Sequence, residues 1–294
     1  VITAAPSYFV YLGVLEAAGA RVVGIPSDDD GMRIDALEEA IRRIVRAGDG
    51  GKLKIVYVTT YFDNPSGVSL SVERRRALLD CVKSFDSIWP LVIEDAAYRE
   101  LAFDGRDTPS LWSFDDGSRV AYLGTCSKPF SPGLRTGFGV LPPQLADKVR
   151  IFKCNHDFGS SNFAQHLIDY AIECGIYDRN VARLRTTYAA KCKTMCDSLT
   201  AELGDAVRWR PPDGGLYVWV DMAGIATGSA DAFFAECARE RVLYVPGEFC
   251  YPDRSAAPRT RIRLSFGFTS CDDITEGVAR LARAAARLRP LAAS

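Results

Sequence analysis

Histidine and lysine are the scarce polar residues of this sequence. Its 294 residues include two histidines, His156 and His166, and eight lysines. The nine cysteines form no Cys-x-x-Cys pair, and with two histidines a zinc site of the usual ligand spacing cannot be assembled. The odd cysteine count also argues against a closed disulfide framework. We therefore expect no metal, and reduced thiols that pack as small hydrophobes.

Long apolar runs and a surplus of charge of one sign are missing as well. No run approaches the roughly 18 residues of a membrane-spanning helix, and the N-terminus lacks the charged-then-apolar pattern of a signal peptide. We therefore predict a cytoplasmic protein without membrane contacts. The 36 basic and 37 acidic residues leave a net charge of -1, which gives no footprint for nucleic acid in this segment. A small anionic ligand would need local positive charge.

The order of the predicted elements is that of an α/β protein. Strand-like segments alternate with helices up to about residue 128, and long Ala- and Arg-rich helices with short strands follow. We predict a mostly parallel sheet flanked by helices in residues 1–175 and a smaller α+β C-terminal domain in residues 176–294. The start without methionine, at VITAAPSYF, is typical of a strand end, so we expect an N-terminal portion to be missing. The arginine run at 74–76 is predicted to be a solvated helix face.

Three successive predicted strands are each followed by a polar side chain. IVYVTTYFDNPSG contains Asn64, PLVIEDAAY contains Asp95 and Tyr98, and VAYLGTCSK ends at Lys128. The spacings of 31 and 33 residues suit βαβ units of about 30 residues or more. If the strands are parallel, these side chains emerge at one edge of the sheet, where open α/β sheets bind ligands.

The chemistry of these groups favours a phosphate-bearing aldehyde as the ligand. A lysine in a partly apolar pocket can attack a carbonyl as a neutral amine, so Lys128 is a candidate covalent anchor. Arg135, Thr125 and Ser127, in a loop rich in glycine and proline, offer a forked cation and neutral donors for a phosphate. Asp95 would be stable opposite a protonated ring nitrogen. Pyridoxal phosphate is a cofactor of this kind.

The segments FDNPSG, IEDAAY, SKPFSPGLRTGF and RIRLSF stand in an order that resembles the class I and II aminotransferases, enzymes of the fold-type-I pyridoxal-phosphate group. Within that group the chain is most similar to the 2-aminoadipate, kynurenine and aromatic aminotransferases, and the C-terminal domains of MocR-type regulators share the same motifs. The resemblance covers essentially the whole chain. It implies a homodimer that moves an amino group from an aromatic, 2-aminoadipate or branched-chain amino acid to a 2-oxo acid such as 2-oxoglutarate.

The resemblance also implies a role for each matching residue. Lys128 is the lysine that binds the cofactor as an imine and shuttles protons, and Asp95 is the partner of the ring nitrogen. Asn64 and Tyr98 fall on positions that bind the phenolic oxygen, and Tyr98 is also counted as catalytic. The remaining matches are the phosphate positions Thr125 and Arg135, the ring-stacking position Tyr8, and Arg263 for the substrate α-carboxylate. Asn64 is counted with Arg263 among the substrate-binding residues.

Two alternatives stay open on the sequence. A family member carries a Gly-rich phosphate loop and an arm ahead of the PSY turn, and neither is present in these residues. The effector domain of a MocR-type transcription regulator is therefore the alternative to an aminotransferase. Within the enzymes, the cofactor also permits decarboxylase, lyase and racemase reactions, since bond orientation decides among them.

Overall fold

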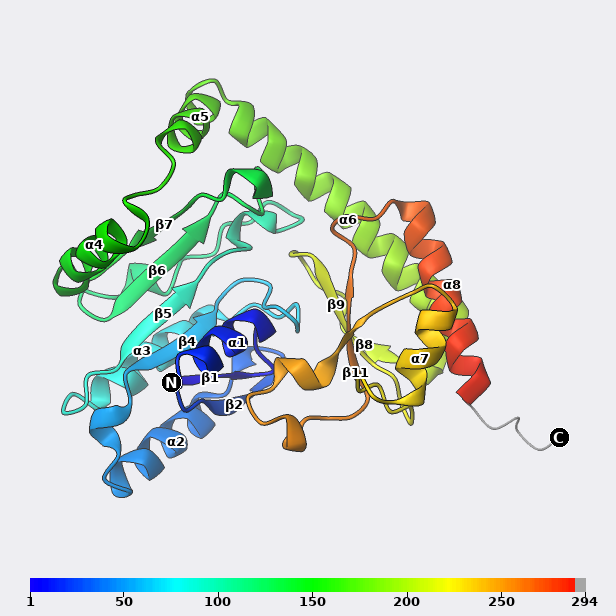
Figure 1. The fold of residues 1–294 in the computed structure, drawn as a ribbon, viewed down its shortest axis with the longest axis horizontal. Helices are drawn as coiled ribbons and strands as arrows, with labels where there is room; N and C mark the ends of the chain where they lie inside the picture. Colours follow the sequence, from blue (N-terminus) through cyan, green and yellow to red (C-terminus); the bar gives the residue numbers. More distant parts are fainter. Residues whose placement is uncertain (289–294) are drawn as a thin grey trace.

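A seven-stranded sheet forms the larger part of the molecule (Figure 1). The computed structural model describes residues 1–288, so residues 289–294, at the end of the predicted smaller domain, lie outside the described residues. The strand order is β3-β2-β1-β4-β5-β6-β7, with parallel pairing from β2 to β6 and antiparallel edge strands β3 and β7. The strands are β1 Ile2–Ala5, β2 Val23–Asp28, β3 Gly31–Met32, β4 Ile55–Thr59, β5 Leu91–Asp95, β6 Val120–Thr125 and β7 Gly137–Val140.

A second sheet of four antiparallel strands lies in the C-terminal part, in the order β10-β11-β9-β8. Its inward faces and the helices α6, α7 and α8 enclose a separate apolar core. The strands are β8 Arg208–Trp209, β9 Tyr217–Asp221, β10 Val245–Pro246 and β11 Arg261–Ser265.

The helices follow the apolar periodicity of the sequence. In the second helix the buried residues Leu37, Ala40, Ile41 and Ile44 recur at helical spacing and face the large sheet. The third helix begins after Ser71, whose hydroxyl accepts a bond from the Arg74 amide as an N-cap. The helices are α1 Phe9–Ala17, α2 Ile34–Arg46, α3 Val72–Ser84, α4 Pro143–Asp157, α5 Asn162–Glu173, α6 Ile176–Leu203, α7 Ala232–Arg239 and α8 Cys271–Leu288.

The long helix α6 connects the two parts of the molecule. It begins beside α5 above the large sheet and runs to α8 beside the small sheet (Figure 1). The prediction of a mostly parallel sheet flanked by helices is confirmed. The domain boundary at 175/176 stays a prediction, and it coincides with Gly175, the residue before α6. No helix within residues 1–288 is both long and apolar enough to span a membrane.

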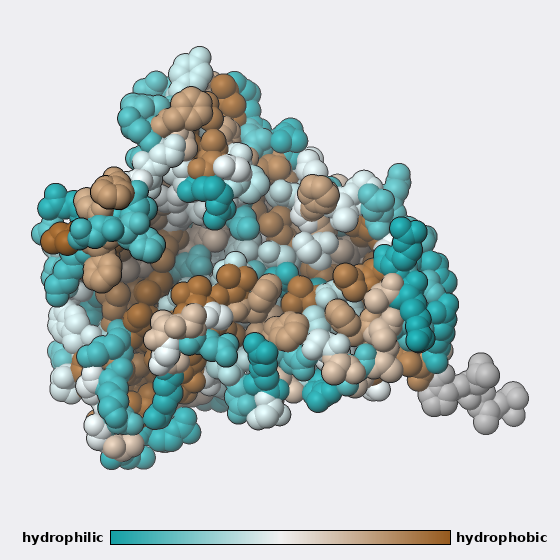
Figure 2. All heavy atoms as spheres, viewed as in Figure 1, coloured by the Kyte–Doolittle hydropathy of each residue, from teal (hydrophilic) through white to brown (hydrophobic). Residues whose placement is uncertain are grey.

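Apolar side chains lie on the outer surface of β7, α4 and α5. Figure 2 shows brown, apolar atoms over α5 and in the hollow between α4 and α1. Phe152 on α4 is 79% exposed and Phe158, just after α4, is 95% exposed. β7 pairs with β6 alone among the described residues, and all four of its residues are exposed. A sheet edge and an apolar surface of this kind mark a region for covering by further protein.

The prediction that residues 74–76 form a solvated face is wrong for Arg75. This side chain is fully buried, and its guanidinium donates to the main-chain carbonyls of Leu70, Thr60 and Pro109. It also lies 4.3 Å from the ring centroid of Tyr61. Arg75 therefore ties α3 to the loop that follows β4, which a surface arginine could not do.

Replacing Arg75 should destabilise the fold strongly. Arg75→Met removes the donors of several main-chain carbonyls at once, so we expect the free energy of unfolding to fall by roughly 3–5 kcal/mol, as measured by urea denaturation. The exposed neighbour Arg76, whose guanidinium lies 4.0 Å from the Phe114 ring centroid, is the matched control. Arg76→Met should cost less than about 1 kcal/mol. Equal effects of the two substitutions would contradict the anchoring role.

Candidate active site

The candidate site lies where β4, β5 and β6 end. The three strands are parallel neighbours, with Thr59 opposite Asp95 and Asp95 opposite Leu123. Parallel strands end at the same edge of a sheet, so the turns that follow them meet there. This confirms the prediction that the segments carrying Asn64, Asp95 and Lys128 emerge together.

Asp95 is a half-buried carboxylate held from two sides. The Tyr57 hydroxyl donates to one oxygen at 2.6 Å, and the Ala97 amide donates to the other at 3.1 Å. Burial raises the pKa of Asp95, while the hydroxyl of Tyr57, the amide of Ala97 and the charge of Lys128 lower it. A cation placed against this carboxylate would gain a strong partner, because the carboxylate has already lost part of its hydration.

Lys128 and Tyr98 lie within electrostatic reach of this carboxylate. The Lys128 Nζ atom is 5.9 Å from the centroid of the Tyr98 ring, and its charge acts on Asp95. The Tyr98 side chain is buried, and burial raises its pKa above that of a free phenol. Tyr98 therefore keeps its proton and can serve as a hydrogen-bond donor at neutral pH.

Asn64 joins the large sheet to the small one. It is buried, follows β4 and precedes a cis Asn64-Pro65 bond. Its Nδ2 atom donates to the Tyr98 hydroxyl at 3.5 Å, and its Oδ1 accepts a 2.8 Å bond from Arg263 on β11. An amide that both donates and accepts can orient a phenol and a guanidinium at once.

Arg263 differs from the two nearby arginines in its partners. Arg259 pairs with Asp231 at 2.8 Å, and Arg261 lies 3.3 Å from Asp221. Within residues 1–288 Arg263 has no carboxylate partner, and its buried Nε atom has no hydrogen-bond partner. A buried guanidinium edge that lacks an acceptor is typical of a site that receives one from a ligand.

Tyr8 is a partly buried phenol on which several charged groups of the site act. Burial raises the pKa of Tyr8, the neighbouring Tyr217 and Asp95 raise it further, and the charges of Arg263 and Arg135 lower it. Its phenol is thus within electrostatic reach of Arg263 and of Arg135. Two cationic groups, each suited to one anion of a ligand, therefore act on this phenol.

The loop after β6 carries the remaining predicted residues. Thr125 accepts a bond from the Ser127 amide at 3.1 Å and donates to the Thr136 carbonyl at 3.4 Å. Arg135 has a left-handed backbone, with φ 53°, and its exposed guanidinium contacts the Pro132 carbonyl at 3.4 Å. The Ser127 hydroxyl makes no hydrogen bond within the described part of the chain. The phosphate-binding roles of these residues stay predictions.

Three residues of the site have no counterpart among the predicted ones. Tyr57 bonds Asp95, Tyr217 contacts Tyr98 and Arg263, and Asp63 is a buried carboxylate beside Asn64. The alternation of side chains along a strand places Tyr57 and Thr59 on one face, and this pattern could have indicated Tyr57. Tyr217 depends on the pairing between β9 and β11, which one sequence does not specify.

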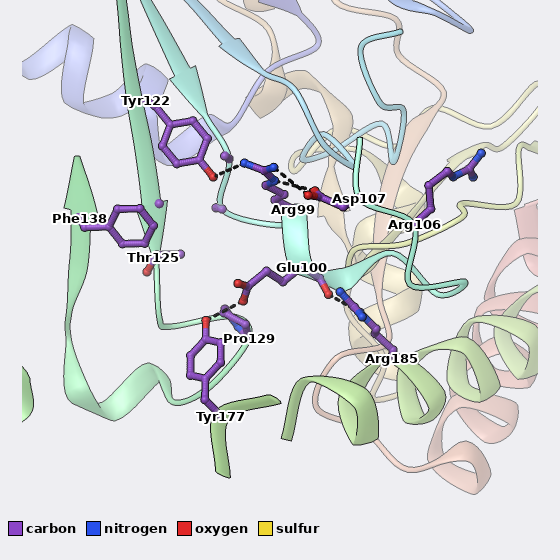
Figure 3. Close-up of a pocket in the computed structure, with 13 residues that line it drawn as sticks. Arg99, Glu100, Arg106, Asp107, Tyr122, Thr125, Pro129, Phe138, Tyr177 and Arg185 are labelled. Atoms are coloured by element: carbon purple, nitrogen blue, oxygen red, sulfur yellow. Dashed lines mark hydrogen bonds and ion pairs between the residues drawn. The ribbon is translucent and has the colours of Figure 1, made fainter. Parts of the chain in front are cut away.

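A separate cavity of about 450 Å³ lies at the same end of the sheet (Figure 3). Tyr122 and Gly124 line it, and strand alternation puts them on the face opposite Asp95 and Leu123. Its charged groups largely satisfy one another, as Arg99 bonds both oxygens of Asp107 and Tyr177 donates to Glu100 at 2.6 Å. The cavity shares Thr125 with the candidate site, and it is also lined by Ala97, whose amide donates to Asp95.

Comparison with known proteins gives one family over nearly the whole chain. The model for aminotransferases of class I and II matches residues 1–281. Aromatic-amino-acid aminotransferase 1 of Thermococcus litoralis is 32% identical over 96% of this chain and 66% of its own length. An uncharacterised HTH-type transcriptional regulator of Bacillus subtilis is 31% identical over 98% of this chain and 56% of its own.

The fold leads to the same proteins. The crystal structure of kynurenine aminotransferase from Pyrococcus horikoshii, solved with PMP and kynurenine, has a TM-score of 0.90 and 30% identity, over 98% of this chain and 70% of that one. The chain therefore spans between about half and two thirds of the length of the curated relatives described here.

The buried carboxylate of Asp63 predicts a pH dependence of stability. Burial raises the pKa of Asp63 from 3.8 to about 6, although the hydrogen bonds from Ser66 act to lower it. Between about pH 4 and 6 the folded state then binds more protons than the unfolded chain, so the free energy of unfolding falls as pH rises through this window.

Substituting Asp63 should remove its part of this decline. Asp63→Asn keeps an acceptor for Ser66 and cannot ionise, so we expect the loss of stability between pH 4 and pH 7 to shrink by up to about 3 kcal/mol. Urea denaturation at several pH values measures the slope. A slope identical to that of the wild type would show that Asp63 ionises in the folded protein as it does in the unfolded chain.

Proposed function

We propose that this chain, which belongs to the class I and II aminotransferases, forms the cofactor- and substrate-binding part of an enzyme dependent on pyridoxal 5'-phosphate. The enzyme would move the amino group of an L-amino acid to a 2-oxo acid. The observation that carries the proposal is the convergence of Lys128, Asp95 and the unpaired edge of Arg263 around Tyr98.

The donor set fits the cofactor group by group. Asp95 is a desolvated carboxylate suited to a protonated ring nitrogen, and Lys128 offers an amine for an aldehyde. Tyr98 and Asn64 offer a hydroxyl and an amide for a phenolic oxygen. Arg135, with the hydroxyls of Thr125 and Ser127, would hold a phosphate, and Tyr8 would lie against the ring. The PMP in the kynurenine aminotransferase complex supports this assignment.

The protein's own groups would then divide the reaction between them. Arg263 binds the substrate carboxylate and thereby fixes the orientation of the Cα-H bond. The Lys128 amine takes the Cα proton and later returns it to another carbon. Asp95 keeps the proton on the ring nitrogen. When bound, the cofactor supplies an electron-poor ring that stabilises the negative charge left by the departing proton.

The relatives and the site together support an aromatic substrate class. The aromatic-amino-acid and kynurenine aminotransferases support an aromatic donor. Phe9, whose ring centroid lies 5.1 Å from the guanidinium carbon of Arg263, would offer such a side chain an apolar ring beside the carboxylate site. Donors of the 2-aminoadipate or branched-chain type, 2-oxoglutarate as acceptor and a cytoplasmic location belong to the same proposal.

A homodimer is part of the proposal as well. The exposed apolar side chains of α4 and α5 form a surface that a second copy would cover. Exposed residues such as Phe152, Phe158, Phe163 and Tyr170 would then leave water.

A second candidate is the effector domain of a transcription regulator. The 31% identity to the Bacillus subtilis regulator, of which this chain matches 56%, is the observation that favours it. Such a domain would bind the same cofactor and amino acid without being required to turn substrate over. A basic winged helix encoded directly upstream would support the regulator, whereas steady production of 2-oxo acid would support the enzyme.

Labelling of Lys128 tests the proposed function. The full-length polypeptide encoded by the gene is mixed with pyridoxal phosphate, reduced with borohydride and mapped by peptide mass spectrometry. We expect the label on Lys128, because its amine faces Asp95 and Tyr98. Lys128→Ala should abolish the label and lower the rate of amino transfer by more than about 1000-fold. A label on a different lysine would overturn the site assignment.

Arg263 and Arg261 form a matched pair for the substrate carboxylate. Arg263→Leu removes the guanidinium that lacks an acid partner, so we expect KM for the amino donor to rise roughly 100-fold. Arg261 already pairs with Asp221, so Arg261→Leu should change KM less than about threefold. The comparison is made by steady-state kinetics at saturating cofactor. A larger effect of Arg261→Leu would move the carboxylate site to that residue.

A further inference from the structure

Tyr217, the first residue of β9, touches both functional halves of the site. Its ring centroid lies 4.2 Å from the guanidinium carbon of Arg263. Its hydroxyl lies 3.4 Å from that of Tyr98, and the two rings meet edge to face at 5.9 Å. One side chain thus connects the arginine proposed for the substrate carboxylate with the phenol proposed for the cofactor.

Asn64 connects the same two residues from the other side. It accepts from Arg263 at 2.8 Å and donates to Tyr98 at 3.5 Å. Arg263, Asn64, Tyr98 and Tyr217 therefore form a closed ring of contacts. Within this set of contacts the guanidinium bonds the amide of Asn64 and lies over the face of Tyr217, and its buried Nε atom stays unbonded.

We propose that Tyr217 is a positioning residue whose ring and hydroxyl have separate tasks; this inference rests on the proposed function. The ring fixes the guanidinium of Arg263 with its unbonded edge toward the substrate carboxylate. The hydroxyl strengthens Tyr98 as a donor toward the phenolic oxygen of the cofactor.

The ring's task follows from the electrostatics of an aromatic face. A guanidinium is attracted to the face of a phenol ring, and the attraction is stronger where water is excluded. Tyr217 is half-buried, and the Nε atom of Arg263 is buried. Without the Tyr217 ring, the guanidinium would keep Asn64 and the more distant Phe9 ring, at 5.1 Å, and could turn its unbonded edge away from the carboxylate.

The hydroxyl's task follows from hydrogen-bond polarity. A phenol hydroxyl can donate or accept. In this structure Tyr98 donates to the Tyr217 oxygen, and once Tyr98 donates to a ligand instead, Tyr217 can donate to Tyr98. Consecutive hydroxyls polarise one another, so the second phenol makes the first a stronger donor. A stronger donor stabilises the anionic phenolic oxygen of the cofactor. The bound cofactor would then titrate at a lower pH.

Two variants separate these tasks. Tyr217→Phe removes the hydroxyl and keeps the ring, whereas Tyr217→Leu removes both. Two quantities are measured on the full-length protein loaded with pyridoxal phosphate. The first is the pH at the midpoint of the change in visible absorbance of the bound cofactor. The second is the Kd of 3-phenylpropanoate, a carboxylate without an amine.

For Tyr217→Phe we expect the absorbance midpoint to rise by roughly half a pH unit, with a Kd within about twofold of the wild type. For Tyr217→Leu we expect the same rise of the midpoint and, in addition, a Kd that is about tenfold weaker. Tyr244, whose buried hydroxyl donates to the Thr227 carbonyl at 3.1 Å in the core of the small sheet, gives the control. Tyr244→Phe also loses a tyrosine hydroxyl bond, yet it should change neither quantity.

The outcomes that would overturn the inference differ from those that would overturn the proposed function. A midpoint within about 0.1 pH unit of the wild type in Tyr217→Phe would refute the hydroxyl's task, and an unchanged Kd in Tyr217→Leu would refute the ring's. A wild-type protein without any visible band would overturn the proposed function and, with it, the hydroxyl's task. Calorimetric titration of 3-phenylpropanoate into the cofactor-free proteins would still decide the ring's task.

Discussion

The parallel pairing of β4, β5 and β6 is the constraint on which the site depends. Because Thr59, Asp95 and Leu123 stand side by side in this register, the three turns that follow begin at one level of the sheet. A shift by one residue would send Asp95 to the opposite face, into the region where Glu94 binds the main-chain amides of Leu111 and Trp112. The fixed register therefore decides which carboxylate faces the lysine and which one supports a loop.

The fold and the polar residues at the strand ends could be predicted from the sequence because both arise from local patterns. Apolar strands, helical periodicity and a spacing of about 30 residues are sufficient to place Asn64, Asp95 and Lys128 at one edge. The helix α4 was not predicted. The short strand β7 was not predicted either, since its sequence GFGV has two glycines and no alternation of apolar and polar residues.

The contacts between distant segments could not be predicted. Arg75 sits in a run of three arginines that is typical of a solvated surface, and nothing local indicates the carbonyls of Leu70, Thr60 and Pro109 that bind it. The same holds for Tyr217, whose neighbours come from the pairing of β9 with β11 and from the packing of the small sheet on the large one. For Arg263, the resemblance indicated the residue itself, but only the ion pairs of Arg259 and Arg261 show why this arginine is the one available.

The bond between Arg263 and Asn64 joins positions 199 residues apart and crosses from one sheet to the other. A small acid gripped by that guanidinium would therefore be held by both parts of the molecule at once. The lifetime of the bound acid would depend on the relative placement of the two sheets, because a movement of the small sheet that lengthens the Arg263–Asn64 bond would also weaken the contact between Arg263 and the acid. In this chain, recognition of a substrate at Arg263, as proposed above, would be coupled to the relative placement of the two parts.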